Sequence, residues 1–185
     1  FLKVTQSIGA LSLFTLLGTS ISYAAETPVD ITNKESDVAV SSNYEPDGVT
    51  LTTQQGQILY NFQGNKEADP ASLSKMMTIY LTLEAVHQGK LKLDDEVKIT
   101  NAYDQLSKMP NLTSVPLNQG QTYTIRDLLK QAALPSSNSA AMILGEQVSG
   151  STSTFTDKMN AQAKAFHMNH TYFVNPAGAA NDLLG

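Results

Sequence analysis

The sequence has no cysteine and no tryptophan, and it contains very little arginine or histidine. The absence of cysteine excludes disulfide bonds, thiolate zinc sites and cysteine nucleophiles. Arg126 is the only arginine, and 17 acidic residues outnumber the 12 basic ones, which gives a net charge of −5. This balance argues against nucleic acid as a partner, because a basic surface supplies most of the affinity for phosphates. Three histidines leave little room for a histidine-rich metal site, and we expect neither a metal nor a cofactor.

Only one long apolar run occurs in the sequence, and it lies near the start. After Lys3, residues 8–21 read IGALSLFTLLGTSI. Residues 22–24 read SYA, so the small residues Ser22 and Ala24 occupy positions −3 and −1 of a cleavage site before Ala25. A basic residue, a short apolar stretch and such a tripeptide describe a secretory signal peptide. The run is too short to span a bilayer comfortably, although an uncleaved anchor and a buried helix are the alternatives. We expect residues 1–24 to be a signal peptide and the protein to be exported.

The first part of the mature chain is polar and then becomes strand-like. Residues 25–48 are rich in Thr, Ser, Asn and Asp, and we interpret them as a linker or loosely ordered arm. Residues 49–53 and 57–60 resemble two strands separated by Gln55 and Gly56, which predicts a β-hairpin.

From Ala71 onward the apolar residues recur at helical spacing. This spacing predicts a largely buried helix that begins at Ala71 and stops near Gly89. Residues 91–100 are expected to form a short strand, and residues 101–123 are expected to be mainly loop. Thr124 and Asp127 form a capping-box pattern that predicts a helix ending before Pro135. Two more helices are expected over residues 139–148 and 152–167, followed by an extended segment and a turn at 175–178.

Ser72 and Lys75 form the first pattern that can carry chemistry. A serine hydroxyl is a weak nucleophile that needs a neighbouring base, and a lysine amine can serve when burial lowers its pKa. At a spacing of three residues the two side chains lie on one face of a helix. The opposing interpretation is a helix cap and a surface lysine. With 17 serines and 11 lysines, about one such pair is expected by chance, so the pair alone is weak evidence.

Ser136, Ser137 and Asn138 form the second pattern. A serine can relay a proton between a base and a leaving group, and an asparagine amide can hold a substrate carbonyl. The same residue types are also favoured helix caps. The three-residue pattern recurs at residues 41–43 in the polar arm, so it is not specific by itself.

Taken together and in order, these patterns resemble a known family. The chain is similar to low-molecular-mass penicillin-binding proteins, which are serine-type D-alanyl-D-alanine carboxypeptidases with a β-lactamase-like fold. The resemblance covers about residues 49–180. It rests on GQILY at 56–60, DPASLSKMMT at 69–78, GKL at 89–91, DDEV at 94–97, YTIRDLL at 123–129, SSN at 136–138 and FVNPAG at 173–178.

The resemblance implies an α/β fold, in which helices pack on an antiparallel sheet, and specific roles for site residues. Ser72 would be the acylated nucleophile, and its backbone N–H would supply half of an oxyanion hole. Lys75 would be the general base, Ser136 would relay the proton and Asn138 would hold the substrate. The implied substrate is the D-Ala-D-Ala end of a peptidoglycan stem peptide, and β-lactams would acylate the same serine. No metal is needed, and the implied location is the cell wall or the outer face of the cytoplasmic membrane.

The sequence departs from the family pattern in two places. The third family motif, Lys-Thr-Gly or a close variant, is absent, and with it the strand that would bind the substrate carboxylate. We therefore expect residues 49–185 to be an incomplete catalytic domain, inactive as it stands, whose missing C-terminal part would hold the last strands and any membrane anchor. Pro135 is unusual before Ser136 and is expected to alter the turn that aims this serine.

Two competing functions remain open. A β-lactamase on the same fold often uses a glutamate to activate water for rapid deacylation, and the stretch after Phe173 contains no glutamate. A non-catalytic cell-wall or penicillin-binding domain is favoured by the missing third motif but opposed by the intact Ser72 and Lys75.

Overall fold

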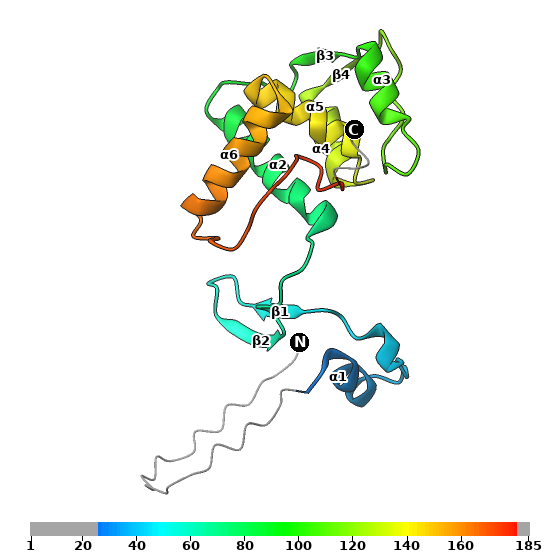
Figure 1. Cartoon of the computed structure of the whole chain (residues 1–185), viewed down its shortest axis with the longest axis vertical. Helices are drawn as coiled ribbons and strands as arrows, with labels where there is room; N and C mark the ends of the chain where they lie inside the picture. Colours follow the sequence, from blue (N-terminus) through cyan, green and yellow to red (C-terminus); the bar gives the residue numbers. More distant parts are fainter. Residues whose placement is uncertain (1–25, 181–185) are drawn as a thin grey trace, which may run out of the picture. The chain divides into compact units, whose positions relative to one another are not determined.

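The structure is a computed structural model of the chain, and it describes residues 26–180 (Figure 1). The predicted signal peptide, residues 1–24, lies outside the described residues. The chain divides into two compact units, Phe1–Ala68 and Asp69–Gly185.

The described part of the first unit begins with a short helix. Helix α1 (Pro28–Glu35) and the 3₁₀ helix η1 (Ser42–Tyr44) lie within the segment that we expected to be a loosely ordered arm. That expectation is wrong for these residues. The Thr27 side chain caps the helix by accepting from the Asp30 amide, and Pro28 occupies a first-turn position where its missing N–H costs nothing. Thr27 and Pro28 are local signals for the start of a helix, and they form one within a segment of polar composition.

The predicted hairpin of the first unit is confirmed. Strands β1 (Val49–Thr52) and β2 (Ile58–Phe62) pair antiparallel, with Leu51 opposite Tyr60. Gly56 has φ +84° in the connecting turn, a conformation that favours glycine. The Tyr60 hydroxyl donates to the Glu26 carbonyl at 2.6 Å, which ties the hairpin to the residues before α1.

The second unit contains helices and one small sheet. The antiparallel strands β3 and β4 pair Val97 with Tyr123, so the unit has an α/β fold. Its elements in chain order are η2 (Ala71–Ser74), α2 (Lys75–His87), β3 (Glu96–Lys98), α3 (Asn101–Ser107), β4 (Thr122–Thr124), α4 (Ile125–Ala133), α5 (Asn138–Ser149) and α6 (Thr152–Ala165).

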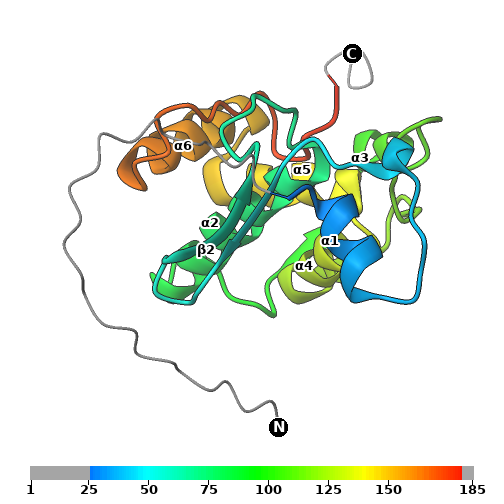
Figure 2. The same cartoon turned by 90° about the horizontal axis from the view of Figure 1, so that it is seen from below.

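Helix α5 is the centre of the second unit. It packs against α2, α3, α4 and α6, and Figure 2 shows it among these helices. Its small residues Ala140, Ala141 and Gly145 are buried, which lets neighbouring elements approach closely. A Cβ on Gly145 would lie only 3.0 Å from atoms of both Phe155 and Pro176. The small-residue character of this helix therefore determines how near α6 and the turn at residues 175–178 can come.

The helix ends of this unit follow their capping residues. The Thr124–Asp127 capping box is present as predicted, with both reciprocal hydrogen bonds formed. Residues 101–107, which we expected to be loop, form α3 because the Thr100 side chain caps the helix on the Tyr103 amide.

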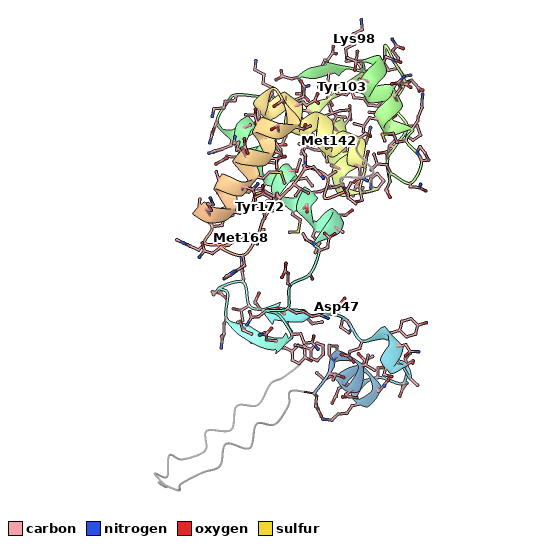
Figure 3. All side chains as sticks on the ribbon, viewed as in Figure 1. Asp47, Lys98, Tyr103, Met142, Met168 and Tyr172 are labelled. Carbon is pink, nitrogen blue, oxygen red and sulfur yellow. The ribbon has the colours of Figure 1, made fainter. Side chains whose placement is uncertain are left out.

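Tyr103 connects α3 to α5. Its hydroxyl donates to the Glu146 carboxylate, and burial together with this bond raises the pKa of Tyr103 to about 12 (Figure 3).

Within residues 26–180, no helix is long and apolar enough to cross a membrane.

The Tyr103 hydrogen bond makes a pH-dependent contribution to stability. The folded chain keeps the Tyr103 proton up to about pH 12, whereas the ordinary pKa is 10.0, so raising the pH between these values favours unfolding. We expect the free energy of unfolding to fall less steeply over this range in Tyr103→Phe than in the wild type. Urea unfolding across the range measures this, with Tyr172→Phe as an exposed control. Equal slopes for Tyr103→Phe and the wild type would contradict the assignment.

Candidate active site

Ser72 and Lys75 lie at the junction of η2 and α2. The Lys75 Nζ is 3.0 Å from the Ser72 Oγ, which is hydrogen-bond distance. Ser72 is exposed, while Lys75 is only 3% exposed. The two side chains share a face because the 3₁₀ turn runs directly into the helix, which keeps residues three apart in register. A reachable hydroxyl therefore faces a buried amine.

Burial shifts the protonation equilibrium of Lys75 toward the neutral amine. Removal of the ammonium group from water penalises its charged form and lowers the pKa of Lys75 below its ordinary value of 10.5. Within residues 26–180, no carboxylate forms an ion pair with Lys75. The environment therefore makes the neutral amine, which has a lone pair available to accept a proton, more accessible than it is in water.

A turn from the end of the described chain holds the other side of Lys75. The Lys75 Nζ donates to the Ala177 carbonyl at 2.9 Å, and the Thr78 hydroxyl donates to the Pro176 carbonyl at 2.7 Å. Residues 170–180 run back across α2 to make these contacts (Figure 1). Gly178 closes the turn with φ +66° and lies so close to Ala71 that a Cβ would be 1.9 Å from the Ala71 carbonyl oxygen.

The backbone next to each serine pattern has an unusual conformation. Ala71, just before Ser72, has φ +44°, and Ser136 has φ +58°. Non-glycine residues rarely adopt this left-handed region, and such strain persists where surrounding contacts enforce it.

The backbone amides around Ser72 differ in their hydrogen bonding. The neighbouring amide of Ala71 donates to the Asp69 carboxylate at 2.9 Å, and that of Leu73 donates to the Pro70 carbonyl at 2.9 Å. In contrast, the Ser72 amide forms no hydrogen bond with the part of the chain that the structure describes. Among residues 26–180 it is a donor without a partner, and it lies beside an exposed hydroxyl.

The second pattern lies at the start of α5. Asn138 is the first residue of α5, is 7% exposed, and its buried Oδ1 has no hydrogen-bond partner among the described residues. A buried amide oxygen without a partner costs stability, so a donor that reached Asn138 would be bound favourably. Ser136 is half-buried in the preceding turn.

A loop after α3 fixes the conformation of this second pattern. The Thr113 carbonyl accepts from the Asn138 amide at 2.8 Å, and the Ser114 hydroxyl accepts from the Ser139 amide at 3.1 Å. The Ser137 hydroxyl accepts from the Val115 amide at 3.3 Å and caps α5. Ser137 is therefore structural, while its neighbours Ser136 and Asn138 keep their side-chain groups available.

The structure thus brings the predicted residues together in two pairs. Ser72 and Lys75 contact one another directly. Ser136 and Asn138 are separated by Ser137, and Asn138 begins α5, which packs against α2. No direct hydrogen bond joins the two pairs within residues 26–180. Sequence analysis missed the turn at residues 175–178 as part of the site, although its FVNPAG sequence was noted as a motif.

The comparison with known families agrees with the geometry. The profile of the Peptidase_S11 family, described as D-alanyl-D-alanine carboxypeptidase, matches residues 37–183. The curated D-alanyl-D-alanine carboxypeptidase DacF of Bacillus subtilis is 34% identical over 134 residues, which cover 72% of this chain and 33% of that relative. The chain thus spans about a third of that protein, and less than half of related carboxypeptidases of Haemophilus influenzae and Escherichia coli.

Solved structures show the same likeness. The peptidoglycan synthesis regulatory factor PBP3 of Streptococcus pneumoniae superposes with a TM-score of 0.70 at 30% identity, covering 75% of this chain and 38% of that one. Penicillin-binding protein D2 of Listeria monocytogenes, solved in its cefotaxime-bound form, gives a TM-score of 0.63 at 32% identity, over 73% of this chain and 53% of that one. The fold, the order of the motifs and the family match agree, and the chain belongs to the D-alanyl-D-alanine carboxypeptidase family, Peptidase_S11.

Proposed function

We propose that the protein is a serine-type D-Ala-D-Ala carboxypeptidase that acts on peptidoglycan stem peptides through an acyl-enzyme. The observation that carries this proposal is the 3.0 Å contact between the exposed Ser72 hydroxyl and the buried Lys75 amine. Burial lowers the pKa of Lys75, and a neutral amine is the form that can act as a base. The family match supports the substrate class.

The first half of the reaction forms an ester on Ser72. The neutral Lys75 Nζ takes the Ser72 proton while the Oγ attacks the carbonyl carbon of the penultimate D-alanine. The Ser72 amide, which lacks a partner among the described residues, donates to the oxyanion that develops, and one such donor is worth about 10²–10³ in rate. The C–N bond then breaks, and the terminal D-alanine leaves as an amine after it receives a proton through Ser136.

The second half of the reaction frees the enzyme. Water attacks the ester carbonyl, Lys75 again accepts the proton, and the Ser72 Oγ leaves as the alkoxide that is reprotonated. An amine acceptor in place of water would give transpeptidation. The unpartnered Oδ1 of Asn138 accepts an N–H of the bound peptide, and its Nδ2 donates to a substrate carbonyl. This use of both ends of the amide would orient the peptide for attack.

The same chemistry explains why β-lactams would bind. Their strained amide presents a carbonyl carbon to the nucleophile. Because the cleaved C–N bond is part of a ring, the leaving nitrogen stays attached to the acyl group and remains in the site. Ampicillin- and cefotaxime-bound structures of the Listeria relative support this class of ligand. A β-lactamase would release the adduct rapidly and a pure binding domain would not form one, so both alternatives are outcomes of the test below.

Location and domain limits are part of the same proposal. A peptidoglycan substrate requires an extracytoplasmic enzyme, which agrees with the predicted signal peptide at residues 1–24. We propose that residues 49–185 belong to the catalytic domain and that these residues alone do not complete the site. The Lys-Thr-Gly motif, which the family uses to bind the substrate carboxylate, is not among the 185 residues.

Acylation of Ser72 is the first test. We expect the natively expressed protein to gain one penicilloyl mass with benzylpenicillin in intact-mass spectrometry, and we expect Ser72→Ala to gain none because the attacking oxygen is gone. Ser153→Ala, which removes an exposed hydroxyl from α6, is the control and should label fully. Labelling of Ser72→Ala equal to the wild type would rule out this nucleophile.

The second pattern has a matched control in the chain itself. We expect Ser136→Ala to reduce release of D-alanine from a D-Ala-D-Ala peptide by about 10²–10⁴-fold, the usual range for a lost proton-transfer group. Asn138→Ala should also reduce this rate, because the amide that orients the substrate is lost. Ser41→Ala and Asn43→Ala, which change the same pattern in the first unit, should leave the rate unchanged. If both pairs of variants behave alike, the roles of Ser136 and Asn138 are wrong.

A further inference from the structure

Asn175 lies in the turn that contacts Lys75 and is itself nearly fully buried, with 5% exposure. Its Oδ1 accepts from the Ala177 amide at 3.0 Å and from the Ala179 amide at 3.2 Å. Its Nδ2 donates to the Ala179 carbonyl at 2.7 Å. One side chain therefore holds the backbone on both sides of the peptide group whose carbonyl accepts from Lys75.

The direction of the Ala177 carbonyl matters because of the hydrogen-bond inventory of a neutral amine. Such an amine has two N–H donors and one lone pair, and a carbonyl oxygen can only accept. With one N–H directed to Ala177, the lone pair is free to face the Ser72 Oγ, which lies 3.0 Å away. Rotation of the Ala177 carbonyl would turn the lone pair away from the hydroxyl.

We propose that Asn175 is a positioning residue, which acts through the Ala177 carbonyl to aim the lone pair of Lys75 at the Ser72 hydroxyl. The proposal rests on the function proposed above. It assigns to the turn at residues 175–178 a role in proton transfer in addition to its packing against α2.

Two neighbouring contacts support this assignment. Thr78, one turn along α2 from Lys75, is fully buried and donates to the Pro176 carbonyl, so the adjacent peptide group is also held. Pro176 has no amide hydrogen that could compete for the Asn175 oxygen. The turn is thus attached to α2 at Lys75 and Thr78, and its own conformation depends on Asn175.

The turn also keeps Lys75 away from water and from charge. Its residues carry no charge, and the shift of the Lys75 pKa has burial as its cause. Asp69 lies before η2, where its carboxylate accepts from the Ala71 amide. The charged residues on the helices packed against α2 are Arg126, Asp127 and Lys130 of α4, Glu146 of α5, and Asp157, Lys158 and Lys164 of α6. A loosened turn would admit water to the amine and raise its pKa.

The test compares two asparagines that hold the same segment. Asn160 on α6 donates to the Phe173 carbonyl at 2.9 Å and accepts from the Phe173 amide at 2.7 Å, but its side chain is not bonded to residues 175–178. The rate of acylation by benzylpenicillin is measured against pH for the natively expressed wild type, Asn175→Ala and Asn160→Ala. Urea unfolding of each variant separates an effect on the reaction from an effect on stability.

We expect Asn175→Ala to acylate about 10–100-fold more slowly, as for a misplaced catalytic group, and to shift the acidic limb of the profile to higher pH. The limb shifts in that direction because a raised Lys75 pKa requires a higher pH to free the lone pair. Asn160→Ala should lose stability while its limb stays in place. An unchanged limb in Asn175→Ala, or an equal shift in Asn160→Ala, overturns the proposal.

A second pair of variants applies if Asn175→Ala does not fold. Thr78→Val removes the bond to the Pro176 carbonyl at nearly constant volume, whereas Thr78→Ser keeps the hydroxyl. The proposal expects the limb to move in Thr78→Val and to stay in Thr78→Ser, and equal profiles contradict it. If the wild type itself is not acylated, the proposed function fails, which is a different result from unequal effects among the variants.

Discussion

The burial of one lysine beside one serine is the constraint on which the site depends. A lysine amine removed from water favours its neutral form, and no carboxylate among the described residues offsets that effect by pairing with Lys75. The amine instead contacts a carbonyl and a hydroxyl, at 2.9 and 3.0 Å. An ammonium paired with a carboxylate would hold its proton, and Ser72 would then remain a weak nucleophile.

The rest of the second unit maintains this arrangement. The contact between Lys75 and Ala177 joins residues 102 positions apart in sequence, so it exists only when the unit has folded. Helix α5 makes the contact possible because Gly145 and neighbouring alanines let Pro176 and α6 approach closely. The packing of small residues in the core and the chemistry at the end of α2 are therefore connected through one turn.

Sequence reasoning predicted the features that depend on local signals. The spacing of Ser72 and Lys75, the capping box at Thr124 and the turn around Gly56 each follow from residues close in the chain. It missed α1 because the polarity of the surrounding segment outweighed the Thr27 cap. It missed α3 because Pro110, Pro116 and Gly120, which favour loops, outweighed the Thr100 cap. It also gave no role to Asn175, since nothing local indicates that this side chain orients a carbonyl against a lysine far earlier in the sequence.

The charge state of Lys75 in the folded protein is the central claim, and an NMR titration of Lys75 measures it directly. Lysine labelled with ¹³C at Cε reports the protonation of each amine, and the signal absent from Lys75→Met identifies the residue. The account predicts that Lys75 titrates below 10.5, the ordinary pKa of a lysine. Titration at or above that value would mean that burial does not favour the neutral amine, and the proton-transfer role assigned to Lys75 would be wrong.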